Sequence, residues 1–305
     1  MSQILQALDN GITPQTVSFA SGDGTVVGLL YLPEGHDTAK RHPAVVTGGS
    51  FSSVKEQMGG IYAAEFAKRG IIALAIDYRN YGQSSGAIRQ YEDSAGKAAD
   101  LSAAVKFLKS RDDVAGVGVF GICTSASNAL FAAAADKDIG AIGTVAGAYF
   151  QPEGQVQMRG ADGVKQRRED GRKARENYAQ NGVIETIKAY SETDQTAANV
   201  APLPYYFDPA RGAVPAWRNE FAVAAWDELL DLDAVSKAAD VTTPALIIHS
   251  DHSAGPDAAR AVHEKLAGPK ELYWTEGAHL DFYDQAPQVR DAADHAAEHF
   301  RKHLS

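Results

Sequence analysis

Short apolar runs alternate with helical patterns along most of this chain, and this rhythm constrains the fold more than any other feature. "HPAVVTGG" (42–49), "IIALAIDY" (71–78) and "VGVFGI" (117–122) are continuous apolar runs, typical of strands covered on both faces. Between the last two, a buried helical face is formed by residues spaced i, i+3, i+4 and i+7, namely Leu101, Ala104, Val105 and Leu108. Because parallel strands need helical crossovers, the alternation predicts an α/β fold with a mostly parallel, doubly wound sheet.

The alternation is interrupted once, which predicts the domain organisation. At the start, "QTVSFAS" and "TVVGLLYLP" flank "GDG", a hairpin pattern. From about residue 151 the chain turns polar and charge-rich, then rich in proline and aromatic residues, and strands return near residue 241. We therefore expect a core formed by residues 1–150 and 241–305, with residues 151–240 inserted as a largely helical lid or cap.

Composition excludes several classes of protein. The net charge of −10 comes without a basic cluster, which argues against nucleic acid or an anionic membrane as the main partner. No apolar stretch approaches the length of a membrane span, and the opening residues lack a basic segment followed by an apolar one. We expect a cytoplasmic protein, with no membrane partner. Its single cysteine rules out an intramolecular disulfide.

That cysteine, Cys123, lies in "GICTS", where a strand gives way to a helix. A sharp turn there presents the side chain beyond the strand end, and the helix N-terminus directs N–H groups at developing negative charge. The turn requires small neighbours, and Gly121 and Ser125 are small. We interpret Cys123 as a nucleophile. An inert buried thiol is the alternative, and a register two residues later would make Ser125 the nucleophile instead.

A nucleophile needs a base and an orienting acid. In this order of elements the base should follow the last strand, where "YWTEGAHLDFYD" supplies His279. The acid should follow "TPALIIHS", and Asp251 comes directly after it. Asp257 is the second choice, because a carboxylate at the start of the next helix also has an ordinary capping role. His295, His299 and His303 are spaced by four and could hold a metal. We interpret them as a solvated helix face and expect no metal or organic cofactor.

The remaining site residues are expected from two other segments. The loop "GGSFSS" should supply the second oxyanion donor, so that the N–H of Phe51, or of Ser50, pairs with that of Thr124. The insertion carries enough aromatic surface to line a substrate pocket together with Ser50, and the residues concerned are Tyr206, Trp217, Phe221 and Trp226. The same aromatic residues could instead pack the lid onto the core or form a homodimer interface.

With these residues in place, the chain resembles the α/β-hydrolase superfamily, and more narrowly its dienelactone-hydrolase-like group, which includes the YcjY-type proteins. "GGSFSSVKEQM" is similar to that group's His-Gly-Phe-x-Gly-x-Lys-Glu motif, and "AIDYRNYGQSSGAIRQYED" to its Asp-Tyr-Arg-x-x-Gly-x-Ser segment. "GICTSAS" matches the Gly-x-Cys-x-Gly elbow, and "HLDFYDQ" the histidine segment. Asp77, Tyr78 and Arg79 match family positions too, and we interpret them as structural.

The resemblance implies a Cys-His-Asp triad, carried here onto Cys123, His279 and Asp251, and hydrolysis of an ester, lactone or thioester through an acyl-cysteine. A small-molecule acyl compound is therefore the expected partner. Two departures matter: Ser125 stands where the family has glycine, and Gly49 stands where it has histidine. Alternatives are a serine esterase using Ser125, an acyltransferase or carbon–carbon hydrolase, or a binding protein whose site has decayed.

Overall fold

The computed structural model describes residues 4–8 and 11–305, so part of the opening segment, residues 1–3 and 9–10, lies outside the described residues. The main sheet has eight strands in the order β1-β2-β4-β3-β5-β6-β11-β12. β2 pairs antiparallel with β1 and β4, and all other neighbours are parallel. The strands are β1 (Gln15–Ser21), β2 (Gly24–Tyr31), β3 (His42–Gly48), β4 (Ile72–Asp77), β5 (Val114–Ile122), β6 (Ala141–Val145), β11 (Ala245–His249) and β12 (Lys270–Trp274).

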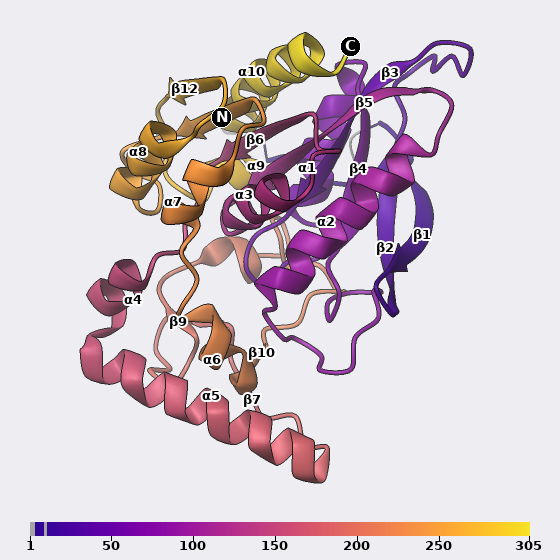
Figure 1. The fold of residues 1–305 in the computed structure, drawn as a ribbon. Coiled ribbons are helices and arrows are strands. Elements are labelled where there is room, and N and C mark those ends of the chain that lie inside the picture. Colours follow the sequence, from indigo (N-terminus) through magenta and orange to yellow (C-terminus); the bar gives the residue numbers. More distant parts are fainter. Residues whose placement is uncertain (1–3, 9–10) are drawn as a thin grey trace.

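Helices cover both faces of the sheet, which confirms the doubly wound α/β prediction (Figure 1). One buried cluster joins the sheet to α1 (Met58–Lys68) and α10 (Ala286–Leu304). A second cluster on the opposite face joins it to α2 (Ser94–Lys109), α3 (Ser125–Ala135) and α8 (Pro256–Lys265). The apolar stripe expected before residue 109 is fully buried on α2. Each face of the sheet therefore has its own hydrophobic core.

The segment between β6 and β11 contributes no strand to the main sheet. It begins with α4 (Pro152–Arg159) and α5 (Ala161–Asn181), and α5 lies along the outer edge of the molecule in Figure 1. Short elements follow: β7 (Thr186–Ile187), β8 (Tyr190–Ser191), β9 (Asn199–Val200), η1 (Pro204–Tyr206), β10 (Phe221–Ala222), η2 (Val223–Ala225), α6 (Trp226–Leu229), α7 (Ala234–Lys237) and η3 (Ala238–Asp240). We call residues 151–240 the cap. Only three residues of α5 are buried, which fits its charge-rich sequence.

The parallel direction of the strands brings the predicted site residues to one edge. Strands β3, β5, β11 and β12 all end there, so the segments that follow them meet at the carboxyl edge of the sheet. These segments carry Phe51, Cys123, Asp251 and His279 in turn, and His279 precedes the short helix α9 (Asp281–Asp284).

The expected elements differ from the observed ones mainly at their ends. The hairpin of β1 and β2 is confirmed, with Ser21 opposite Gly24. The segment "VKEQMGGIYAAEFAKRG" (54–70) has a helical pattern, but α1 begins only at Met58, because residues 54–57 form turns held by the Val54 carbonyl and the Gln57 side chain. In the part of the chain that the structure describes, no helix has the length and apolar character to cross a membrane.

Candidate active site

Cys123 occupies a strained turn between β5 and α3. Its φ of 55° lies in the left-handed region, which a residue with a side chain adopts only when its surroundings enforce it. Here the Cys123 carbonyl accepts hydrogen bonds from Ala126 and Ala148, both at 3.0 Å. A Cβ added at Gly121 would lie 2.3 Å from the Ser125 carbonyl oxygen, so only glycine fits where the chain passes the helix. This is the elbow geometry that presents a nucleophile.

The thiol is almost enclosed, with 8% of the Cys123 residue exposed. Burial raises the pKa of this thiol, and hydrogen bonds from the Tyr283 hydroxyl and from the N–H groups of Thr124 and Phe51 oppose the increase only in part. The structure thus brings both expected oxyanion donors to the sulfur. It also places there a tyrosine that the sequence reasoning did not consider.

Tyr283 lies between the thiol and His279. The Nε2 atom of His279 is 3.1 Å from the Tyr283 hydroxyl, and the two residues are one helical turn apart. On the other side of the ring, the Ala254 N–H donates to Nδ1 at 3.3 Å. Burial lowers the pKa of His279 to about 4, so the ring is neutral at pH 7. The histidine therefore reaches the cysteine through a tyrosine hydroxyl.

The structure does not bring either candidate acid to His279. The Asp251 carboxylate is 65% exposed and accepts a hydrogen bond from Arg260 at 2.7 Å. Asp257 is fully exposed and lies 3.6 Å from the same guanidinium group. Hydrogen bonding to Arg260 lowers the pKa of Asp251. Both carboxylates thus pair with Arg260, and Nδ1 of His279 accepts a hydrogen bond from a backbone N–H instead of donating to a carboxylate.

The Ser125 hydroxyl is fully buried and already engaged. It donates to the Gly49 carbonyl, and it lies 2.8 Å from the hydroxyl of Tyr78. A Cβ at Gly49 would be 2.2 Å from the Ser53 hydroxyl, which explains why this loop has no room for the histidine of the related motif unless Ser53 moves. Ser125 therefore links the elbow to the loop after β3.

Asp77 and Arg79 have structural partners, as the sequence reasoning proposed. The fully buried Asp77 carboxylate accepts hydrogen bonds from the Lys55 ammonium at 2.7 Å and the Lys55 N–H at 2.8 Å. Arg79 donates to Asp100 on α2. These ion pairs fix the loops that follow β3 and β4.

A cluster of hydroxyl groups joins the cap to the loop after β3. The Ser50 and Tyr206 hydroxyls are 2.5 Å apart, and the Tyr190 hydroxyl donates to the Phe51 carbonyl at 2.9 Å and lies 3.2 Å from the Tyr206 hydroxyl. Burial raises the pKa of Tyr190 and of Tyr206, so both remain protonated donors at neutral pH. Ser50 and Tyr206 were expected at the pocket, whereas Tyr190 was missed.

The other cap aromatics divide into two groups. Trp217 stacks on Tyr206 with ring centres 5.2 Å apart and donates to the Ser52 hydroxyl at 3.3 Å, and Phe221 stacks on Phe51 at 5.4 Å. Trp226 instead packs against Phe221 and lies under the guanidinium of Arg159. Trp217 and Phe221 therefore lie over the loop of residues 49–53, which we call the oxyanion loop because it is expected to supply an oxyanion donor, and Trp226 packs inside the cap.

One sequence expectation outside this site is wrong. The histidines on α10 were interpreted as a solvated face, but His299 is only 2% exposed. Its ring lies between α10 and the sheet, close to Glu271 on β12 and to His303. The sequence spacing suggested that all three histidines share one exposed face of the helix, whereas His299 points inward.

Comparisons with known proteins agree with this geometry. The model of the X-Pro dipeptidyl-peptidase (S15) family matches residues 23–281. The uncharacterized protein PA2218 of Pseudomonas aeruginosa is 31% identical over 306 residues, covering 94% of this chain and 80% of its own length. Its crystal structure superposes with a TM-score of 0.84, covering 100% of this chain and 99% of that one.

Two further relatives are informative. The uncharacterized protein YcjY of Escherichia coli K12 is 26% identical over 302 residues, covering 94% of this chain and 98% of its own. The thiohydrolase aneE of Aspergillus aculeatus is 37% identical over 130 residues, which is 42% of this chain and 39% of that protein.

The strand order, the strained elbow after β5 and these matches define an α/β hydrolase. Within that superfamily, the chain belongs to the X-Pro dipeptidyl-peptidase (S15) family.

Proposed function

We propose that this protein hydrolyses an ester, lactone or thioester through an acyl-cysteine intermediate on Cys123. The observation that supports this most directly is the elbow itself, where a buried thiol at a left-handed φ meets two backbone N–H groups. Those N–H groups, of Phe51 and Thr124, would hold the oxyanion that forms when sulfur attacks a carbonyl. The partial similarity to a thiohydrolase agrees with this substrate class.

The proton path we propose runs through Tyr283. As the sulfur attacks the acyl carbon, the thiol proton passes to the Tyr283 oxygen while the tyrosine proton passes to Nε2 of His279. The tetrahedral intermediate then collapses, the bond to the leaving group breaks, and the leaving group takes the proton back along the same path. Water hydrolyses the acyl-cysteine by the same transfers.

This path requires a change at His279. A backbone N–H can only donate, so the hydrogen bond from Ala254 makes Nδ1 an acceptor and leaves the proton of the neutral ring on Nε2. In that tautomer Nε2 donates to Tyr283 and has no lone pair for a proton. We propose that the loop of residues 250–255 shifts when substrate binds and gives Nδ1 an acceptor, with Asp251 released from Arg260 in that role.

The leaving group expected for such a site is a good one. In the resting site the imidazole has a pKa of about 4 and a backbone donor on Nδ1, so protonating a departing amine depends entirely on the shift of residues 250–255. Alcohols activated by an aryl group, enols and thiols depart without that help. We therefore favour activated esters, lactones and thioesters over the peptide bond in the name of the family.

We propose that substrate approaches through the cap, where a cleft of about 580 Å³ is lined by Tyr190 together with Lys188, Phe207 and Asn219. Tyr190 also belongs to the hydroxyl cluster at the oxyanion loop, so it connects the cleft to the site. An acyl group on the nearly enclosed Cys123 would be shielded from water, which favours acyl transfer to a second nucleophile as the alternative function.

The test is intact-mass analysis and peptide mapping after brief reaction with an activated aryl ester and an acid quench. An acyl group on the Cys123 peptide, absent in Cys123→Ala and retained in Ser125→Ala, is the expected result. An adduct on Ser125 would make this a serine esterase, and no adduct on either would favour the binding-protein alternative. Partition of the acyl group between water and an added alcohol or amine separates hydrolysis from transfer.

A further inference from the structure

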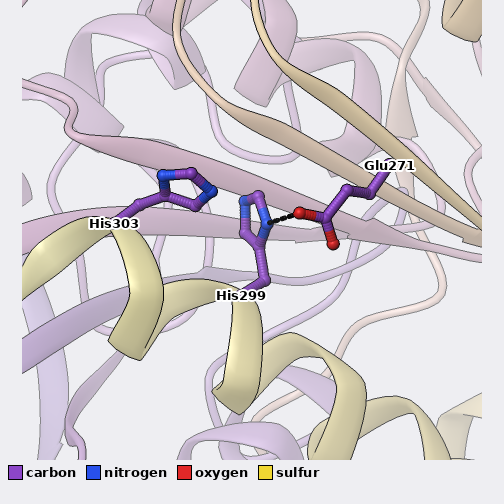
Figure 2. A group of neighbouring side chains, drawn as sticks. All are labelled: Glu271, His299 and His303. Carbon is purple, nitrogen blue, oxygen red and sulfur yellow. Dashed lines mark ion pairs between the residues drawn. The ribbon is translucent and has the colours of Figure 1, made fainter.

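A second group of reactive side chains lies between α10 and β12, apart from Cys123. Figure 2 shows His299 between His303, from the same helix, and Glu271 of the edge strand. The nearest nitrogens and carboxylate oxygen of these three residues all lie within 4.8 Å of one another, and Nδ1 of His299 is 3.9 Å from a Glu271 oxygen. Residues four apart on a helix point to one side, so both imidazoles can reach a common ion.

His299 is the observation that needs explaining. It is 2% exposed, and neither ring nitrogen makes a hydrogen bond of good geometry among the described residues, although the backbone of Pro244 and Ile142 is near enough to interact with the ring. Leaving a buried polar group without a partner costs free energy, so such a group indicates an interaction that is missing.

We propose that Glu271, His299 and His303 bind a divalent transition metal ion, with Zn²⁺ the best match to two imidazoles and one carboxylate. Zn²⁺ at about 2.1 Å from each donor places the donors about 3.4 Å apart, so Glu271 and His303 must close on the ion by little more than 1 Å. Glu271 is 43% exposed and can rotate. The ion would tie the end of α10 to the edge of the sheet.

The surroundings leave space for further ligands and supply one competitor. A cavity of about 240 Å³ lies beside the group, lined by Glu271 and His299 and by His295 and Glu298. Water or a small anion could complete a tetrahedral site from that side. The ammonium of Lys302 is 2.7 Å from the Glu271 carboxylate, but its side chain is 62% exposed and free to swing into solvent.

The experiment is calorimetric titration of the full chain with Zn²⁺, after chelator treatment, in a Cys123→Ala background that removes the thiol as a rival ligand. We expect one ion per chain and a higher melting temperature with zinc. Glu271→Gln and His303→Ala should each weaken binding by at least about tenfold. Lys302→Met should strengthen it, because it removes the cation that competes for Glu271.

His263→Ala is the matched control, because it removes a histidine from another helix, α8, that lies outside the group of three and outside the cavity beside it. It should leave the affinity unchanged. The proposal is overturned if zinc does not saturate a single site, or if His263→Ala weakens binding as much as His303→Ala. Neither result bears on Cys123, which is absent from the protein tested.

Discussion

Replacing Tyr283 by phenylalanine tests the proton path. The substitution keeps the ring, which packs edge-to-face on Tyr205 with centres 5.0 Å apart, and removes only the hydroxyl. That oxygen joins Nε2 of His279 to the Cys123 thiol. Without the hydroxyl, nothing links the His279 ring to the Cys123 sulfur, and both the Nε2–H of His279 and the Cys123 thiol lose a hydrogen-bond partner.

The magnitude follows from these two losses. A positioned proton-transfer group contributes about 10²–10⁴ to the rate, so we expect kcat/KM for an activated ester to fall at least about 100-fold, or about 2.7 kcal/mol of transition-state stabilisation. Stability should fall by only about 1–3 kcal/mol, the cost of unsatisfied buried groups. Because the Tyr283 hydroxyl lowers the thiol pKa, alkylation of Cys123 should also shift to higher pH.

The assays are steady-state hydrolysis of an aryl ester and the pH dependence of alkylation by iodoacetamide. Tyr62→Phe is the matched control, because its buried hydroxyl donates to the Phe282 carbonyl at 3.0 Å on the same side of the fold and touches neither catalytic side chain. If Tyr283→Phe stays within about threefold of the wild type in kcat/KM, with an unchanged alkylation profile, His279 acts on Cys123 directly and the relay is refuted.

Two further predictions concern the end of β11 and the loop that follows it. If Asp251 orients His279 during turnover, Asp251→Asn should lower kcat/KM at least about 100-fold. Asp257→Asn, the control, removes a carboxylate beside the same Arg260 and should leave kcat/KM within about twofold of the wild type. If the two variants have equal kcat/KM, the site is a Cys-His pair without an acid. His249 is fully buried, and burial first, then the charges of His279 and Arg260, lower its pKa to about 4 against a weaker opposing effect of Asp251. Because the pKa of His249 is lower in the folded state than in the unfolded state, its contribution to the free energy of unfolding is fully present above about pH 6.5 and is lost as the pH falls towards 4. The free energy of unfolding, measured in denaturant, should therefore be lower at pH 4.5 than at pH 7 by about 2 kcal/mol from this residue. His249→Leu should reduce that difference.

The core of the fold follows from patterns that sequence carries locally. Continuous apolar runs become β3, β4 and β5, and the i, i+3, i+4 spacing before residue 109 becomes the buried face of α2. The position of Cys123 followed for the same reason, since strand, small residues and helix are consecutive in the chain. Parallel strand direction then brings the other segments to the same edge without further information.

The cap could not be predicted in the same detail. Its residues pack through contacts between distant segments, such as Tyr206 with Ser50 across 156 positions of the chain. Nothing in the local pattern distinguishes Trp226, which packs within the cap, from Trp217, which lies over the oxyanion loop. Tyr283 was within reach, however, because it follows His279 by four residues in a helical pattern and so must lie beside it.

The position of the triad acid in the chain can be predicted from the order of the strands, but whether its side chain reaches the histidine depends on the side-chain geometry. Asp251 follows β11 as expected, but the carboxylate turns to Arg260, whose guanidinium is also held over the Trp274 ring at 3.9 Å. Ala254 on the same short loop then fills the place at Nδ1 with a donor. A histidine so held stabilises a thiolate through Tyr283 but cannot take its proton. On the proton path that we propose, turnover therefore begins with movement of residues 250–255.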